Sequence, residues 1–442
     1  MLTHESDVLV VGGGAAGLMA AVAAARAGVS VALVERDARL GKKILATGNG
    51  RCNLSNLTIG EAGSVGQYNQ PGFVAPALKR YGCSEVRALF EEMGLLSVCD
   101  AKGWVFPYTR KANSVLDVLL NEVRRLGVVV HTEQGVQELV LTQDGVFRAV
   151  GETICLTAPA LVIASGADGP AASLKPHRVV PLTPVLGPLK TEKEPLKGLD
   201  GVRASAAVAL MDGGQTLSRE SGEVLFRDYG ISGIVVFNLS RFARPGHEVV
   251  IDLMSGHTDA ECRAMLERRH LRNPDAPIRE LLDGLLHPRL AQAVIRRSGM
   301  RATDEAERNM LYEIVKSMKK YRLSVTGTSS KTQAQTFRGG LVVEDFDPTT
   351  LQSLLLPRLF AAGECLDVDG PCGGFNLHWA WASGYVAGSG AAAAAADSRA
   401  AAAAATATAA TGAAAAATAA ASSGATKAAA ATAAAAASDA IS

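Results

Sequence analysis

Residues 8–17 read Val8-Leu-Val-Val-Gly-Gly-Gly-Ala-Ala-Gly17 and are the most informative segment for the fold class. Val8 to Val11 is a continuous apolar run, which is typical of a strand buried on both faces of a sheet. The glycines are followed by an alanine-rich, helix-compatible run from Leu18 to Ala27, and Gly28 is a typical helix-ending residue. Ser30 to Glu35 then reads as a second buried strand. The sequence therefore predicts a β-α-β unit and an α/β, Rossmann-like domain.

The glycine spacing at this strand-to-helix turn is the dinucleotide-binding fingerprint G-x-G-x-x-G. Such a turn lets a pyrophosphate approach the unpaired N–H groups of a helix N-terminus. Glu35 follows Gly17 by 18 residues, where an acid accepts hydrogen bonds from a ribose diol and disfavours a 2′-phosphate. The alternative is a glycine-rich turn with no ligand. The cofactor-binding candidates here are Gly12, Gly14, Ala15, Ala16, Gly17 and Glu35.

The other end of the chain favours FAD over NAD. Another strand–glycine–acid element begins at Leu359 and reaches Gly363, Glu364 and Asp367. A helix-compatible run follows a second glycine turn. FAD-binding folds need such a return to the sheet because their long cofactor crosses it. The backbone N–H groups at this helix start are expected to face the flavin. The turn supplies the candidates Gly373, Gly374, Phe375 and Asn376.

The polar, glycine-rich segment 41–56 is expected to be an ordered functional loop. Lys42 and Lys43 either face phosphate or flavin or remain solvated, and Cys52 is more compatible with packing than with a thiol relay because no cysteine lies at redox spacing. His378 is either a proton donor or a packing histidine. The remaining cofactor-binding candidates are Lys42, Lys43, Thr47, Gly48, Arg51, Cys52, Asn53, Val136, Ser165 and Gly166. No catalytic residue and no metal ligand is assigned.

Composition along the chain predicts that two subdomains interrupt the FAD-binding domain. The expected order is 1–181 (FAD-binding domain, first part), 182–256 (β-rich), 257–325 (helical), 326–392 (FAD-binding domain, second part) and 393–442 (disordered tail). The tail is alanine-rich: 34 of the residues in 391–442 are alanine, so few large side chains are available for docking. A partner-binding helix is the alternative for the tail.

Four groups of residues give the chain a family resemblance. They are Gly12-Gly-Gly-Ala-Ala-Gly17, Gly41-Lys-Lys with Thr47-Gly-Asn-Gly-Arg-Cys-Asn53, Leu225-Phe with Tyr229-Gly-Ile-Ser-Gly233, and Ala362-Gly-Glu with Asp367-Val-Asp and Gly373-Gly-Phe-Asn376. Over residues 5–390 the chain resembles the aminoacetone-oxidase-like flavoproteins, also described as NAD(P)/FAD-dependent oxidoreductases of the bile-acid-operon type, in the glutathione-reductase-like FAD superfamily. The resemblance implies an FAD domain interrupted by a β-barrel-like subdomain and a helical subdomain. The chain departs from the family pattern in two places. The segment after Gly166 is shortened, and position 378 is His378 where the family usually has glutamine.

The expected protein is therefore an FAD-dependent oxidoreductase. Hydride would pass through flavin N5 from NAD(P)H or an organic donor to an organic acceptor or oxygen, with NAD(P)H as a transient donor because no second dinucleotide-binding module is present. Rival hypotheses are an FAD-binding tRNA-modification protein and a non-catalytic flavin-binding protein. Residues 258–330 hold 14 Lys and Arg against 10 Asp and Glu, a weak basic excess for RNA.

Charge and cysteine usage narrow the expected partners and location. A net charge of +1 argues against a dedicated nucleic-acid binder, so a small-molecule substrate is expected, with no nucleic acid and no membrane partner. Seven scattered cysteines, none in a C-x-x-C pair, favour a reducing cytoplasm. The N-terminus has no signal-peptide pattern, and no run of about 20 strongly apolar residues is present. The oligomeric state is left open.

Overall fold

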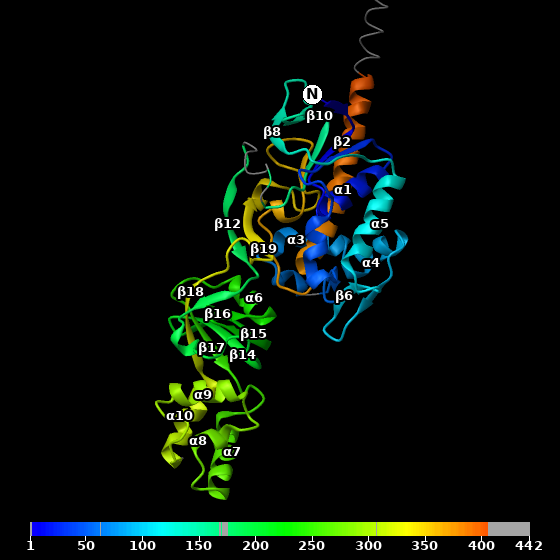
Figure 1. Cartoon of the computed structure of the whole chain (residues 1–442). Coiled ribbons are helices and arrows are strands. Elements are labelled where there is room, and N and C mark those ends of the chain that lie inside the picture. The colour runs from blue at the N-terminus through cyan, green and yellow to red at the C-terminus, as the bar shows by residue number, and fades with distance from the viewer. Residues whose placement is uncertain (1, 62, 168, 170–175, 306, 405–442) are drawn as a thin grey trace, which may run out of the picture.

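A parallel five-stranded sheet lies at the centre of the first domain, in the order β20-β11-β2-β3-β7. The structure is a computed structural model that describes residues 2–61, 63–167, 169, 176–305 and 307–404 (Figure 1). The strands of this sheet are β2 (Val8–Val11), β3 (Val31–Val34), β7 (Val129–His131), β11 (Ala160–Ile163) and β20 (Leu359–Ala361). The chain passes from β2 through α1 (Ala15–Arg26) to β3, which confirms the predicted β-α-β unit. β20 pairs with β11 although the whole inserted region separates them in the sequence.

Smaller sheets and helices surround this central sheet. A four-stranded sheet has the order β1-β10-β9-β8, and a three-stranded sheet has the order β4-β6-β5. The strands of the four-stranded sheet are β1 (Leu2–Glu5), β8 (Val136–Leu141), β9 (Phe147–Gly151) and β10 (Ile154–Ala158). The strands of the three-stranded sheet are β4 (Ser55–Asn56), β5 (Ser97–Cys99) and β6 (Trp104–Pro107). The helices are α2 (Lys42–Ala46), α3 (Pro71–Arg80), α4 (Cys83–Glu92) and α5 (Ala112–Arg125), with short 3-10 turns at η1 (Thr47–Gly50), η2 (Ser64–Gln67), η5 (Val343–Asp345) and η6 (Gly363–Cys365).

A closed barrel forms the first part of the insertion, in the order β13-β16-β15-β14-β17-β18. Its strands are β13 (Leu189–Thr191), β14 (Arg203–Asp212), β15 (Gln215–Arg227), β16 (Gly230–Ser232), β17 (Glu248–Asp252) and β18 (Tyr321–Gly327). The turn η4 (Glu194–Leu196) and the helix α6 (Ile234–Ser240) belong to the same region, and α6 packs against β15. The expected β-barrel-like subdomain is therefore present.

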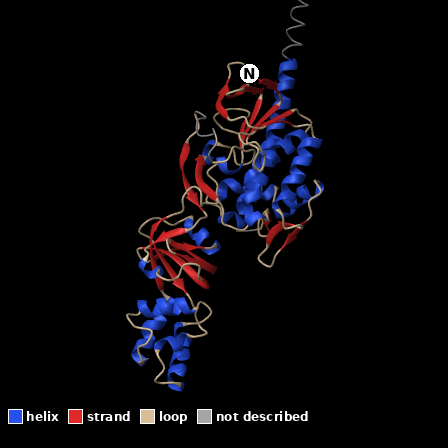
Figure 2. Cartoon of the chain, viewed as in Figure 1, coloured by secondary structure: helices blue, strands red, loops and turns tan. Residues whose placement is uncertain are grey.

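The helical part of the insertion lies between β17 and β18, at the end of the molecule far from the parallel sheet (Figures 1 and 2). Its helices are α7 (Asp259–Arg272), α8 (Ile278–Leu282), α9 (Pro288–Arg297) and α10 (Arg308–Lys319). One hydrophobic cluster contains side chains of both the barrel, such as Phe226, and the helices, such as Leu266 and Ile314. Barrel and helices therefore share one core, which is separate from the core of the FAD-binding domain.

A two-stranded ribbon joins the insertion to the first domain. β12 (Val179–Val185) pairs antiparallel with β19 (Thr336–Leu341), so the chain enters and leaves the insertion at adjacent points. The boundary expected at residue 325 needs correction because β18 completes the barrel as far as Gly327. The helical pattern of α10 runs almost directly into β18, which concealed the change from helix to strand in the sequence.

The C-terminal helix is longer than the sequence predicted. It covers residues 375–404, and a Cβ atom added at Gly384 or Gly388 would lie 2.3 or 2.2 Å from a backbone oxygen of α1. The boundary of a disordered tail at residue 393 is therefore wrong for 393–404: Ala395 is fully buried, and Arg399 pairs with Asp7 at 3.0 Å. Small side chains dock here because they allow close helix packing. Residues 405–442 lie outside the described residues. None of the helices in the described residues has both the length and the apolar character that a membrane span requires.

Candidate functional site

The glycine turn between β2 and α1 is shaped by contacts on both sides. A Cβ atom added at Gly12 would lie 2.4 Å from the carbonyl oxygen of Ala164, and one at Gly17 would lie 1.8 Å from the carbonyl oxygen of Gly12. A Cβ atom at Gly14 would meet no atom within 4 Å. The outer glycines are therefore required by packing, whereas the middle glycine leaves open space beside the helix N-terminus.

That helix N-terminus has no side-chain cap. Gly14 is the N-cap residue of α1 and provides no side-chain hydrogen bond, so the first-turn N–H groups, which include those of Ala15 and Ala16, lack intrahelical partners. These N–H groups and the helix dipole favour an anion in the space beside Gly14.

Glu35 lies at the edge of the same turn. Its Oε2 accepts a hydrogen bond from the N–H of Gly13 at 2.7 Å, and its Oε1 accepts one from the N–H of Asp37 at 2.9 Å. The backbone N–H of Gln134 donates to the carbonyl oxygen of Glu35, which brings the segment leading to Val136 at the start of β8 to this end of the site. The carboxylate is therefore held beside the turn. Its contact with a ribose remains a prediction.

Two loops at the ends of parallel strands converge on the first turn of α1. Ser165 follows β11, and its hydroxyl is buried without a hydrogen-bond partner among the described residues. A Cβ atom added at Gly363, after β20, would lie 2.8 Å from the Cβ atom of Ala16, and one at Gly166 would lie 4.0 Å from Oε2 of Glu364. The structure thus brings together candidates that the sequence separates by hundreds of positions. Most of the shortened segment after Gly166 lies outside the described residues.

Glu364 connects this convergence to α2 and to the ribbon. Its carboxylate forms an ion pair with Lys43 and accepts hydrogen bonds from the hydroxyl of Thr336 and, at 3.1 Å, from the N–H of Phe337. Lys42 instead pairs with Asp37 at 3.4 Å, and 73% of its side chain is exposed. Of the two lysines, Lys43 is therefore the one held at the site.

The loop of residues 47–53 is built around a buried cysteine. The N–H of Cys52 donates to the carbonyl oxygen of Thr47 at 3.1 Å, and burial raises the pKa of the Cys52 thiol to about 11. The thiol is thus protonated at neutral pH, which supports the packing role over a thiol relay. The side-chain amide of Asn53 is oriented so that its nitrogen faces two acceptors, and it donates to the carbonyl oxygens of Val105 and Ser55. Gly48 has a positive φ of 56°, and Arg51 is exposed.

The turn at the start of the C-terminal helix is packed more tightly than the sequence suggested. A Cβ atom added at Gly374 would lie 2.3 Å from the carbonyl oxygen of Ser55, and one at Gly373 would lie 2.9 Å from Nε1 of Trp104. The need for glycine at position 374 therefore comes from Ser55, and no approach of a flavin ring is required to explain it. Phe375 is buried, and its carbonyl oxygen accepts from the hydroxyl of Tyr68 at 2.9 Å.

Asn376 closes the loop that precedes this turn. Its Oδ1 accepts from the N–H of Gly370 at 2.8 Å, and its Nδ2 donates to the carbonyl oxygens of Gly370 and Pro371. In this structure the side-chain amide is therefore engaged within its own loop. The backbone N–H groups of the helix start remain the donors available for a ligand.

Asp367 and His378 have structural partners. Asp367 Oδ1 accepts from the N–H of Gly339 at 2.8 Å, and His378 Nδ1 lies 2.8 Å from the hydroxyl of Ser55. His378 Nε2 lies 2.9 Å from the carbonyl oxygen of Tyr81, which only accepts, so this nitrogen carries the proton. Burial lowers the pKa of His378 to about 4. The ring is neutral at pH 7 and packs, which favours the second of the two roles expected for it.

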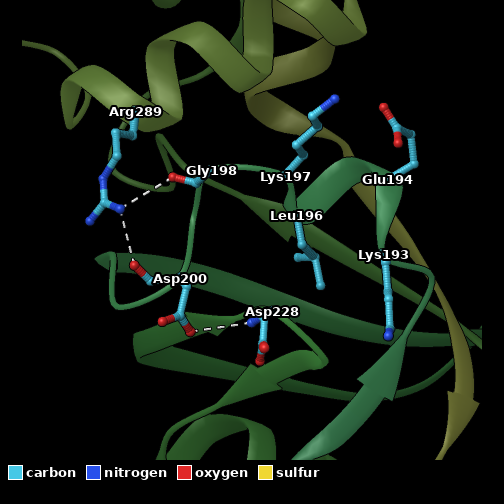
Figure 3. A pocket seen from close by; sticks show the side chains of 8 residues that line it. All are labelled: Lys193, Glu194, Leu196, Lys197, Gly198, Asp200, Asp228 and Arg289. Atoms are coloured by element: carbon cyan, nitrogen blue, oxygen red, sulfur yellow. Dashed lines mark hydrogen bonds between the residues drawn. The ribbon is translucent and has the colours of Figure 1, made fainter.

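A separate cleft of about 380 Å³ lies between the barrel and the helical part (Figure 3). Arg289 donates there to the backbone oxygens of Asp200 at 3.1 Å and Gly198 at 3.3 Å, and Lys193 and Lys197 point in opposite directions. Basic and acidic residues both line this cleft, so no single sign of charge dominates it. None of the sequence-predicted candidates lines it. Within the described ranges, no group of three or more His, Cys, Asp or Glu side chains is arranged to hold a metal ion.

The residues around α1 fit a bound FAD. A pyrophosphate and a ribose need space and hydrogen-bonding groups. The site offers open space at Gly14, an uncapped helix N-terminus, the nearby carboxylate of Glu35, and the hydroxyl of Ser165, which has no hydrogen-bond partner among the described residues. Three residues that the sequence analysis did not select are Asp369, Arg241 and Arg338, which form a buried ion-pair cluster beside the second turn. Only Asp369 had a signal, as part of the Asp367-Val-Asp motif; the arginines lie outside any motif.

The chain is similar to a known protein family and to individual proteins over most of its length. Residues 6–390 match the family model described as "HI0933-like protein Rossmann domain". The chain is 34% identical to the 3-dehydro-bile acid delta(4,6)-reductase of Clostridium scindens, over 86% of this chain and 98% of that protein. It is 26% identical to the ribosomal RNA dihydrouridine synthase of Escherichia coli, over 86% of this chain and 96% of that protein. A solved structure of the open conformation of a flavocytochrome c3 fumarate reductase is 17% identical, covering 89% of this chain and 79% of that chain with a TM-score of 0.45.

Proposed function

The chain belongs to the HI0933-like Rossmann-domain family of FAD-dependent oxidoreductases, and from that premise we propose that it saturates a carbon–carbon double bond conjugated to a carbonyl group in a small organic substrate. The observation that carries a flavin role is the convergence of the Gly12–Gly17 turn, Ser165–Gly166 and Gly363–Glu364 on one uncapped helix N-terminus.

Each part of the site has a proposed task. The N–H groups of Ala15 and Ala16 would bind the pyrophosphate beside Gly14, and Glu35 would accept from the adenosine ribose. The backbone donors of the turn at 373–376 would face the flavin end. Bound FAD would supply two-electron chemistry, in which a hydride is accepted from a donor and delivered to an acceptor.

The names of the two kinds of relative point to one substrate chemistry. A delta(4,6)-reductase acting on a 3-dehydro-bile acid removes double bonds conjugated to a 3-keto group, and a dihydrouridine synthase saturates the double bond conjugated to a carbonyl in uracil. Both reactions add one hydride and one proton across an activated double bond. An α,β-unsaturated carbonyl is therefore the substrate class that we propose for this chain.

A small molecule is favoured over RNA as the substrate. The identity is higher to the bile-acid reductase, at 34%, than to the RNA-modifying relative, at 26%, and the net charge of the chain is only +1. RNA remains the second candidate because the RNA-modifying relative matches over 96% of its own length. Strong RNA binding that weakens steeply with salt would favour this second candidate.

NAD(P)H is the proposed transient electron donor, and a reducing cytoplasm is the proposed location. All seven cysteines are free, which is compatible with such a compartment. The donor would dock without a dinucleotide-binding module of its own.

Purification followed by an anaerobic assay tests the proposed function. The protein should be yellow and should release FAD, rather than FMN, on acid treatment. After reduction by dithionite, NADH or NADPH, it should be reoxidised by a 3-keto-Δ4 steroid, with a product two hydrogens heavier by mass spectrometry. A colourless protein that cannot be reconstituted with FAD contradicts the flavin assignment. Reoxidation only by unmodified ribosomal RNA would replace the small-molecule substrate with RNA.

A further inference from the structure

A carboxylate with two arginine partners lies where three parts of the chain meet. The side chain of Asp369 is fully buried. Its Oδ2 accepts from Nε of Arg241 at 2.7 Å, and its Oδ1 accepts from Nε of Arg338 at 2.6 Å. A second guanidinium nitrogen of Arg338 lies 3.1 Å from Oδ2. Both carboxylate oxygens are therefore bound by charged donors, as a buried carboxylate requires.

The three residues come from three parts of the molecule, of which the barrel has a core separate from that of the FAD-binding domain. Arg241 follows α6 in the barrel, Arg338 lies in β19 of the ribbon, and Asp369 lies in the loop between η6 and the C-terminal helix. Arg241 is itself buried, with 5% of its side chain exposed, while 28% of the Arg338 side chain is exposed. The cluster thus fixes the barrel against the loop that leads to the second turn.

Further hydrogen bonds leave this loop little freedom. Arg241 Nη2 donates to the carbonyl oxygens of Gln67 at 2.9 Å and Asp369 at 3.0 Å, and Arg338 Nη1 donates to the carbonyl oxygen of Arg241 at 2.7 Å. The side chain of Asn238, in α6, accepts from the N–H of Cys372 at 2.9 Å.

The next residues of the loop continue directly into the proposed flavin-facing turn. Gly370 follows Asp369 and is bound by the amide of Asn376 through both its N–H and its carbonyl oxygen. The position of the turn is thus connected to the barrel through the ion-pair cluster.

Stability alone does not explain why such a cluster is present. Buried ion pairs contribute little net stability, because the cost of removing charges from water offsets their attraction, and their best-supported role is to specify one arrangement. We propose that Asp369, Arg241 and Arg338 are positioning residues that hold the barrel on loop 369–372 and thereby set where the backbone donors of the turn at 373–376 meet the flavin. This inference rests on the proposed function for its flavin part, while the connection between barrel and loop stands on the contacts above.

The test compares Asp369→Asn with Asp345→Asn in the FAD-loaded protein. Asp345 also accepts from an arginine, Arg178 (Nε to Oδ1, 3.0 Å), and its side chain is 5% exposed. This pair joins the residue before β12 to η5, and among the described residues no hydrogen bond or ion pair links it to the turn. Asp345→Asn therefore reports the general cost of losing a buried carboxylate. The measurements are the FAD dissociation constant, the midpoint potential of the bound flavin, and hydrogen exchange of residues 366–376.

Asp369→Asn should weaken FAD binding at least tenfold, shift the midpoint potential and speed exchange in 366–376. Asp345→Asn should lower thermal stability while leaving these three quantities near wild type. Equal effects of the two variants, or wild-type values for Asp369→Asn, would overturn the inference. If Asp369→Asn does not fold, Arg338→Lys takes its place, because this half-buried arginine is easier to replace; the same three shifts, smaller in size, are expected.

Failure of the proposed function has a different signature. It would appear as wild-type protein that does not bind FAD. In that case exchange in 366–376 of the ligand-free chain still decides the inference: faster exchange in Asp369→Asn but not in Asp345→Asn supports the cluster's role, and no difference refutes it.

Discussion

Lys43 and Glu364 form an ion pair between α2 and η6, which lie 321 residues apart in the sequence. The pair joins the two ends of the FAD-binding domain beside the first turn of α1. Glu364 also accepts from Thr336 and Phe337, whereas Lys43 makes its contact with 58% of its side chain exposed.

The two partners should therefore differ in their effect on stability. Lys43→Ala should lower the free energy of unfolding by less than about 1 kcal/mol, because an exposed ion pair contributes little. Glu364→Ala should lower it by about 2–3 kcal/mol, because two further donors lose their acceptor. Urea unfolding measures both values, with Lys42→Ala as an exposed control. Equal losses for Lys43 and Glu364 would contradict this account of the pair.

The glycines of the first turn should separate the fold from the cofactor site. Gly14→Ala should cost less than about 1 kcal/mol in the ligand-free protein, because its Cβ atom enters open space, but it should weaken FAD binding more than tenfold by occupying the place of the pyrophosphate. Gly17→Ala should destabilise the ligand-free protein itself, because its Cβ atom would lie 1.8 Å from a backbone oxygen. Thermal melts and FAD titrations distinguish the two. Wild-type FAD affinity in Gly14→Ala would place the cofactor elsewhere.

Glu35→Ala should weaken FAD binding by roughly 10- to 150-fold, since a hydrogen bond to a charged acceptor contributes about 1.5–3 kcal/mol. The carboxylate also accepts from Gly13 and Asp37, so a modest loss of stability is expected as well. Asp37→Ala is the matched control, because it removes a neighbouring carboxylate that pairs with Lys42 at the surface. The dissociation constant is the deciding measurement, and equal effects of the two substitutions would refute the ribose assignment.

His378 should make stability depend on pH on the acid side. The folded-state pKa is lowered from 6.5 to about 4, so between these values the unfolded chain binds a proton that the folded chain does not. The free energy of unfolding should therefore fall as pH drops from 6.5 towards 4, by about 2 kcal/mol from this group. His378→Gln should remove this dependence, because glutamine can accept from Ser55 and donate to Tyr81 without titrating. The exposed His257→Gln is the control for urea unfolding at several pH values; an unchanged slope in His378→Gln would disprove the neutral, buried state.

The C-terminal helix should contribute to stability as far as its described end. A chain ending after Gly390 loses the buried Ala391, Ala392 and Ala395 and the pair between Arg399 and Asp7, so its free energy of unfolding should fall by about 2–3 kcal/mol. A chain ending after Ala404 keeps these contacts and serves as the control. Identical melting temperatures for the two chains would show that residues 391–404 add nothing to the fold.

The sequence predicted the elements whose signals are local. The apolar runs and glycines from Val8 to Glu35 indicated β2, α1 and β3, and the change in composition indicated the barrel and the helices. Two things had no local signal. The pairing of Asp369 with Arg241 joins residues 128 positions apart, and no periodicity reports such a contact. The C-terminal helix approaches α1 closely at Gly384 and Gly388 and continues into the buried Ala391, Ala392 and Ala395, and the burial of these alanines cannot be inferred from a low-complexity run.

The antiparallel ribbon of β12 and β19 also affects the order in which parts of the chain can fold during synthesis. Val185 and Thr336 are paired neighbours, so the inserted unit begins and ends at one place and has a core of its own. A ribosome releases all strands of this unit, through β18, before it releases β20 and the C-terminal helix. The barrel and its helices can therefore fold during synthesis, while the sheet that surrounds the glycine turn must wait for its last strand.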